Sequence, residues 1–166
     1  MSLTIREVAV EDAQGIIDVL NPIINEARYT ILDQTFTVDE EKGFIESFPK
    51  RGVFTVAVNE TTNQLLGFQN VEPFATYTKA FDHVGIIGTY VHANSRGQGV
   101  AKQLFDYTFK AAKAKGYEKL FAYVRADNER ALAVYLKQGF EIVGTAKKHS
   151  KIGDQYFDEI LIEKFL

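Results

Sequence analysis

Apolar and polar residues alternate along this chain with two different periods, and the switches between them predict a mixed α/β fold. Residues 3–5 alternate with a period of two and predict a strand. Apolar residues between Ile16 and Leu20 then recur at helical spacing and predict a helix. Pro22 either kinks this helix or ends it before a second, short one.

A second helix and a hairpin are predicted next. Thr37 and Glu40 have the spacing of a capping box, which predicts a helix that begins there and runs to about Phe48. From residue 53 onward the period returns to two. The runs 53–58 and 65–72 flank the polar segment NETTNQ, and together they predict an antiparallel hairpin.

The second half of the chain alternates strands and helices. VGIIGTYV, residues 84–91, is apolar on both faces and predicts a central strand. Helical spacing follows from Val100 to Ala112, with Gly116 placed to end that helix. The rest predicts a strand, a helix and a closing hairpin, in the segments KLFAYV, NERALAVYLKQ, FEIVGTA and YFDEILIEKF. This order predicts one α/β (α+β) domain spanning 1–166, its sheet largely antiparallel except where helices cross over.

Composition excludes several classes of function. The 166 residues are 46% hydrophobic, which is enough for one substantial core. With 19 basic and 22 acidic side chains the net charge is −3, so no basic surface predicts binding to nucleic acid or membrane. The chain has no cysteine, which excludes a thiol nucleophile, and its N-terminus lacks the apolar region of a signal peptide. We therefore expect a cytoplasmic protein.

The segment HANSRGQGVAKQLF, residues 92–105, places glycines where a loop gives way to a helix. A nucleoside-triphosphate P-loop needs lysine and then serine or threonine after its last glycine, whereas Gly99 is followed by Val100 and Ala101. A dinucleotide fingerprint needs a third glycine where this chain has Lys102. Both of these phosphate-binding designs are therefore disfavoured.

The stretch from Arg96 to Ala101 can still hold an anion. Its glycines leave the backbone unhindered, so amides can turn toward a ligand while the helix that begins near Val100 adds the positive end of its dipole. Several such contacts together can bind a pyrophosphate. A purely structural alternative is that the glycines only form a tight loop and cap the helix.

The pattern Arg-x-x-Gly-x-Ala after an apolar strand resembles the acyl-CoA-binding motif of the GNAT superfamily of N-acetyltransferases. Asn128 and Tyr135 lie on the next predicted helix, and YLKQGFEIVGTAKK is similar to the ending Tyr-x-x-x-Gly-Phe of that family. The resemblance covers the whole chain in element order. It implies the GNAT fold, a mixed and mostly antiparallel sheet of about seven strands that is flanked by helices and has splayed central strands.

Within that superfamily the chain is most similar to the phosphinothricin-type amino-acid acetyltransferases. The segments that carry this similarity are PIINEARYTILDQTF, VEPFATYTKAFDHV, YVHANSRGQGVAKQLF and GFEIVGTAKKHSKIGDQYFDEILI. The chain departs from that group in two places. Ile86 stands where the group carries a glutamate on the central strand, and Tyr135 stands where it carries a histidine on the following helix. These departures argue against a herbicide-like amino acid as the substrate.

The resemblance also implies a co-substrate and the residues that bind it. The co-substrate is acetyl-CoA, and the chemistry needs no metal. Tyr135 is the expected catalytic acid, since a phenol can give a proton to the leaving thiolate, although it could also be a core aromatic. The residues expected to bind acetyl-CoA are Tyr90, Val91, Arg96, Gly97, Gln98, Gly99, Val100, Ala101, Asn128 and Tyr135.

The acceptor, the base and the assembly are less defined by the sequence. We expect a small primary amine as acceptor, an amino acid or an analogue of one. The alternatives are a polyamine, a protein N-terminus, or a CoA-binding regulator without catalysis. Glu72, Asp82, His83 and a water molecule are the candidate bases. The resemblance implies a homodimer.

The aromatic residues expected to wall the acceptor site are Tyr29, Phe36, Phe74, Tyr77 and Phe81, with Arg28 as a candidate partner for a carboxylate.

Overall fold

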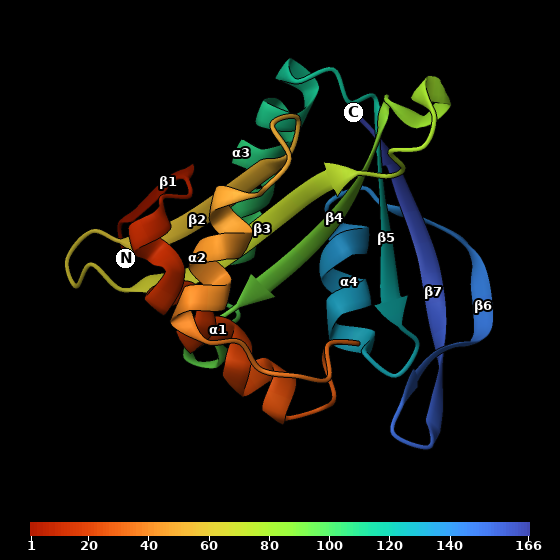
Figure 1. The fold of residues 1–166 in the computed structure, drawn as a ribbon, viewed down its shortest axis with the longest axis horizontal. Helices are drawn as coiled ribbons and strands as arrows, with labels where there is room; N and C mark the ends of the chain where they lie inside the picture. The colour runs from red at the N-terminus through yellow and green to blue at the C-terminus, as the bar shows by residue number, and fades with distance from the viewer.

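The computed structural model describes all 166 residues and contains a seven-stranded sheet in the order β1-β2-β3-β4-β5-β7-β6 (Figure 1). The strands are β1 (Leu3–Glu7), β2 (Val53–Asn59), β3 (Leu65–Pro73), β4 (Val84–Val91), β5 (Lys119–Arg125), β6 (Glu141–Ile152) and β7 (Gln155–Phe165). All neighbouring pairs are antiparallel except β4 and β5. A helix connects those two strands, which is the connection that parallel pairing requires. The predicted fold class is therefore confirmed.

Four α-helices and three short 3-10 helices complete the fold. They are α1 (Ala13–Asn25), α2 (Val38–Glu46), α3 (Val100–Ala114), α4 (Glu129–Lys137), η1 (Val10–Asp12), η2 (Lys79–Phe81) and η3 (Ala93–Ser95). The capping box predicted for α2 is present, because Glu40 N donates to Thr37 Oγ1 at 3.2 Å and Thr37 N donates to Glu40 Oε2 at 2.7 Å. None of the helices has the length and apolar character that crossing a membrane demands.

Helix α1 continues through Pro22 as one helix, so the proline does not end it, which was one of the two alternatives left open by the sequence. Proline removes one backbone hydrogen bond from a helix interior. Val19 and Leu20 before the proline, and Ile23 and Ile24 after it, are all buried in the same apolar cluster. Packing on both sides of Pro22 therefore holds the helix together across the missing bond.

The helices cover the two faces of the sheet in pairs (Figure 1). Helices α1 and α2 lie on one face, where α1 packs with Phe54, Val56 and Phe68. Helices α3 and α4 contribute Phe105 and Tyr135 to the core cluster of the other face. Because successive residues of a strand point to opposite faces, the almost fully buried strand β2 supplies side chains to both layers.

Strands β4 and β5 separate from one another along their length. They pair only where Val84–Ile86 lies beside Lys119–Phe121, although both strands continue well beyond these residues. Figure 1 shows the two strands diverging, with α4 visible in the gap between them. The segment that joins α1 to α2, residues 26–37, runs past the open end of this gap (Figure 1). The splayed central strands are thus present, and part of the β4 edge has no neighbouring strand.

Strand β6 is longer than the alternating pattern predicts. The apolar run FEIVGTA ends at Ala146, but β6 continues to Ile152 because β7 pairs with it again beyond an irregularity between Ala146 and Ser150. Lys148, within this irregularity, has a positive φ of 49°. The bulge interrupts the alternation on which the prediction depends.

Helix α2 carries one buried carboxylate that makes stability depend on pH. Glu41 is 4% exposed, and its burial raises the pKa of the carboxyl group from the ordinary 4.5 to about 7. A pKa that is higher in the folded state favours folding at low pH, and this contribution is lost as pH rises through 7. Glu41→Gln is therefore expected to raise the free energy of unfolding by about 1–3 kcal/mol at pH 8.5 and much less at pH 5.

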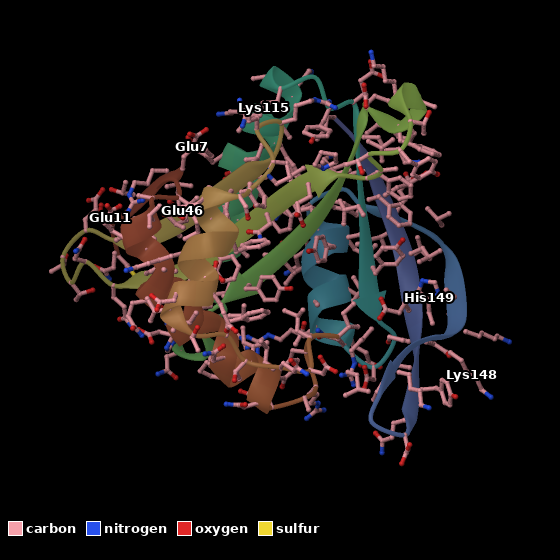
Figure 2. All side chains as sticks on the ribbon, viewed as in Figure 1. Glu7, Glu11, Glu46, Lys115, Lys148 and His149 are labelled. Atoms are coloured by element: carbon pink, nitrogen blue, oxygen red, sulfur yellow. The ribbon has the colours of Figure 1, made fainter.

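Urea unfolding at the two pH values measures this difference. Glu46→Gln is the matched control, since Glu46 is exposed on the same helix (Figure 2). An equal effect of Glu41→Gln at both pH values would contradict the expectation.

Candidate active site

The loop before α3 presents backbone amides without covering them. Gly97 and Gly99 have φ values of +75° and +84°, and a Cβ atom at either position would meet no atom within 4 Å. Gly99 is the N-cap of α3 in the left-handed conformation, and no side chain caps the helix. The first-turn amides of α3 therefore remain available to an anion, with the helix dipole in the favourable direction.

A cavity of about 290 Å³ lies against this helix end, between the splayed part of β4 and α4. All but one of the residues expected to bind acetyl-CoA line it: Tyr90, Val91, Arg96, Gly97, Gly99, Val100, Ala101, Asn128 and Tyr135. The exception is Gln98, whose Nε2 donates to the carbonyl oxygen of Asn94 at 2.8 Å. The fold thus brings the strand end, the glycine loop and α4 to one site.

Four cationic side chains line the same cavity, namely Arg96, Lys102, Arg130 and Lys137. Sequence reasoning proposed only Arg96 and missed the other three. The spacing of seven residues between Arg130 and Lys137 was the available signal, because it places both side chains on one face of α4. Lys147, Lys148 and Lys151 on β6 do not line the cavity. Figure 2 shows Lys148 on the outer side of the β6–β7 hairpin.

Tyr90 on β4 lines the cavity and also packs against the core. Its ring stacks on Phe68 at 4.9 Å between centroids, within the core beneath α1. His92, directly after the same strand, uses its Nδ1 to accept a hydrogen bond from Asn94 N, and it does not line the cavity.

Tyr135 is held by a hydrogen bond within the sheet. Its side chain is buried on α4, with 6% exposure, and its hydroxyl donates to Thr89 Oγ1 at 2.9 Å. Gln69 Nε2 donates to the same oxygen at 3.0 Å. Burial raises the pKa of the Tyr135 hydroxyl well above its ordinary value. The hydroxyl therefore stays protonated and can act as a hydrogen-bond donor throughout the physiological range.

A second cavity, of about 340 Å³, adjoins the first. The residues that line both are Tyr29, Thr89, Tyr90, Asn128, Ala131 and Tyr135. These shared residues lie between the two cavities, and they include the hydrogen-bonded pair Tyr135 and Thr89. Thr89, which sequence reasoning missed, is a polar residue within the apolar run of β4, and that contrast was the signal that could have singled it out.

Comparison with known proteins identifies the family. The model of the acetyltransferase (GNAT) family matches residues 23–140, which include the glycine loop and Tyr135. The chain belongs to the acetyltransferase (GNAT) family. A phosphinothricin N-acetyltransferase from Streptomyces coelicolor is 24% identical over 162 residues, which cover 96% of this chain and 94% of that protein.

Solved structures share the GNAT fold with this chain. An N-acetyltransferase from Staphylococcus aureus has a TM-score of 0.90 and 26% identity, and the match covers 99% of both chains. A GNAT phosphinothricin acetyltransferase from Sinorhizobium meliloti, solved in complex with AcCoA, has a TM-score of 0.89 and 18% identity. That match covers 100% of this chain and 89% of the other.

The candidate bases of this GNAT protein are separated by the fold. Glu72 lines the second cavity, and partial burial raises the pKa of its carboxyl group. It lies directly across from Ile86 in the β3–β4 register, so a carboxylate is present one strand away from the position expected for a glutamate. Asp82 and His83 line neither cavity, and Asp82 pairs with Arg51 at 3.6 Å.

The expected aromatic wall of the acceptor site is mostly elsewhere. Tyr29 lines both cavities, but Phe36 packs against the core beneath α1. Phe74 and Tyr77 instead contact Phe81 in the loop before β4, and none of these three lines the second cavity. Arg28 is exposed and lines neither cavity.

Arg125, which sequence reasoning did not single out, fastens the segment 26–37 to the end of β5. Arg125 is 5% exposed, and its Nη1 donates to the carbonyl oxygens of Ala27 and Thr30, at 3.0 and 3.2 Å. Its Nε and Nη2 donate to the carboxylate of Asp127, at 3.0 and 2.7 Å.

Asn128 adds a second attachment for this segment. Its Nδ2 donates to the carbonyl oxygen of Tyr29 at 3.4 Å, while its Oδ1 accepts from Ala131 N and caps α4. The segment therefore has fixed contacts beside both cavities.

Proposed function

We propose that this protein is an acetyl-CoA-dependent N-acetyltransferase that acetylates the primary amine of a small molecule. The observation that carries the proposal is a pair of adjacent cavities that both have Tyr135 and Thr89 in their lining. One cavity has the free amides and cationic side chains suited to a phosphate-bearing ligand, and the other can hold a small acceptor. The relative from Sinorhizobium meliloti that was solved with AcCoA supports the choice of co-substrate.

The first cavity has the donor groups that acetyl-CoA would need. The amides of α3 would bind the pyrophosphate, assisted by the cations of Arg96 and Lys102. The part of β4 that lacks a strand neighbour would pair with the pantetheine amides in the manner of an added strand, along Tyr90 and Val91. Acetyl-CoA supplies the acetyl thioester to the site where the cavities meet.

Acyl transfer requires a neutral amine nitrogen, which forms the new C–N bond as the C–S bond breaks and the sulfur takes up a proton. We assign proton donation at the sulfur to the Tyr135 hydroxyl. A phenol is protonated at neutral pH, so this hydroxyl has a proton to give as negative charge develops on the sulfur. Thr89 fixes the hydroxyl at the junction of the cavities. Glu72 or a water molecule would receive a proton from the amine.

Gly99 gives a test of the phosphate-binding loop. Gly99→Ala places a side chain at a φ of +84°, which costs about 1–2 kcal/mol and shifts the first-turn amides. We expect the KM for acetyl-CoA to rise about tenfold while kcat changes little. Gly116→Ala is the matched control, because Gly116 has a φ of +92° at the other end of α3. An equal rise in KM for both variants would mean that strain alone is responsible.

The activity itself is tested by incubating the protein with acetyl-CoA and pools of amines, and by detecting acetylated products by mass. Separate pools contain amino acids, amino-acid analogues, polyamines, monoamines and short peptides. A product with saturating kinetics is expected from a pool of small amines. Acetylation of peptides alone would favour a protein N-terminus as acceptor. Binding of acetyl-CoA without any product would favour a regulator.

A further inference from the structure

A buried carboxylate in the second cavity has no partner in the fold. Glu159 on β7 is 1% exposed, and neither of its carboxylate oxygens takes part in a hydrogen bond. It lines the cavity together with Thr89 and Tyr135. An unpartnered buried carboxylate is costly to the folded state, and such groups normally have partners. The position therefore indicates a ligand that supplies hydrogen-bond donors.

Other acceptor groups on the same face of the sheet add to this imbalance. Asn70 lines the cavity, and its Oδ1 is buried without a hydrogen-bond partner. Glu72 also lines the cavity and adds a second carboxylate. Asn70 and Glu72 are two residues apart on β3, so both side chains point to one face. Oxygen acceptors therefore reach the cavity from β3 on one side and from β7 on the other.

Arg125 is the one cationic side chain that lines this cavity, and the segment 26–37 already engages it. Four hydrogen bonds link its guanidinium to Asp127 and to the carbonyl oxygens of Ala27 and Thr30, out of five N–H groups in all. Arg125 on β5 lies directly across from Glu159 on β7, but its guanidinium donates no hydrogen bond to the Glu159 carboxylate. An acceptor with its own carboxylate would meet two glutamates and no free cation.

We propose that Glu159 binds the ammonium group of the acceptor, and that the enzyme therefore acetylates cationic primary amines that have no carboxylate beside the reacting nitrogen. This inference rests on the proposed function and narrows its substrate class. An ammonium group carries three donors and a positive charge, which match an unpartnered carboxylate and an unpartnered amide oxygen. A zwitterionic amino acid places a carboxylate two bonds from the nitrogen, within the same negative surroundings.

Matched pairs of ligands separate the two kinds of acceptor. One pair is phenethylamine and phenylalanine, and the other is isoamylamine and leucine. Within each pair the two ligands differ only in the carboxylate. Their binding to the protein saturated with CoA can be measured by calorimetry without any reaction. We expect each amine to bind at least about tenfold more tightly than its amino acid. Glu159→Gln should weaken amine binding about 10- to 100-fold, as expected for loss of a hydrogen bond to a charged group.

Two further variants keep the test specific. Glu163→Gln is the matched control, since Glu163 lies on the same face of β7, pairs with Lys119 and lines neither described cavity. It should bind amines as the wild type does. Glu159→Asp keeps the charge and should retain part of the affinity. Unchanged acetyl-CoA binding by each variant shows that the fold is intact. If Glu159 had only a structural role, its substitution would weaken the binding of acetyl-CoA as well as that of the amines.

The outcomes distinguish this inference from the proposed function. If phenylalanine binds as tightly as phenethylamine, if none of the amines binds, or if Glu159→Gln binds amines normally, the inference is wrong even where acetylated products form. If the amines bind through Glu159 but none is acetylated, the role of Glu159 in binding ammonium groups holds, whereas the proposed acetyltransferase activity and the substrate class that rests on it fail.

Discussion

Tyr135→Phe is expected to lower kcat about 10²-fold while the KM for acetyl-CoA stays nearly unchanged. The variant keeps the ring, which packs edge-on against Phe105 and Phe140, and removes only the hydroxyl that donates to Thr89. Loss of that hydrogen bond should also lower the free energy of unfolding by about 1 kcal/mol. Steady-state kinetics with varied acetyl-CoA, using an acceptor found in the amine pools, measures both constants.

Tyr117→Phe is the matched control for this experiment. Tyr117 is 1% exposed in the same core cluster, and its hydroxyl is buried without a hydrogen-bond partner. Removing that hydroxyl should leave kcat unchanged and should not lower stability, because no bond is lost. An unchanged kcat in Tyr135→Phe would mean that the Tyr135 hydroxyl has no part in the mechanism.

Arg125→Met is expected to lower the free energy of unfolding by about 2–4 kcal/mol. Methionine has a similar reach but no donors, so the carbonyl oxygens of Ala27 and Thr30 and the carboxylate of Asp127 lose their partner. The guanidinium also lies over the ring of Phe157, 3.9 Å from its centroid, and that contact is lost as well. Urea unfolding monitored by circular dichroism gives the difference.

Arg6→Met shows what a more exposed ion pair contributes. Arg6 pairs with Asp12 at 2.7 Å, but its side chain is 41% exposed, whereas that of Arg125 is 4% exposed. Water screens the more exposed pair, so its loss should cost only about 0–1 kcal/mol. Similar losses in the two variants would contradict a structural role for Arg125 in holding the segment 26–37.

The glycine loop could be located from the sequence because its properties are local. Gly97 and Gly99 lie directly before a helix, and their positive φ values depend on the absence of a side chain at those positions. The N-cap role of Asn128 is also local, since it needs only the following amide of Ala131. Tyr135 was selected by its place in the family pattern, and the structure puts it at the junction of the cavities.

Glu159 and Arg125 could not be selected in this way. Each lies in an ordinary strand pattern, and nothing nearby in the sequence marks Glu159 as buried without a partner. Asp82 and His83 are the opposite case, because they precede the central strand closely but lie outside both cavities. Alternation along a strand assigns a residue to one face of the sheet, but it does not say what lies opposite that residue.

Local patterns of period, capping and glycine placement were sufficient for the order of strands and helices and for the loop before α3. They were sufficient because each depends on residues close together in the chain. The divergence of β4 from β5, the fastening of the segment 26–37 by Arg125 and the exposure of Glu159 to the second cavity depended on the tertiary structure. These features arise from the side-by-side arrangement of strands that are distant in sequence, and packing of the whole sheet determines that arrangement.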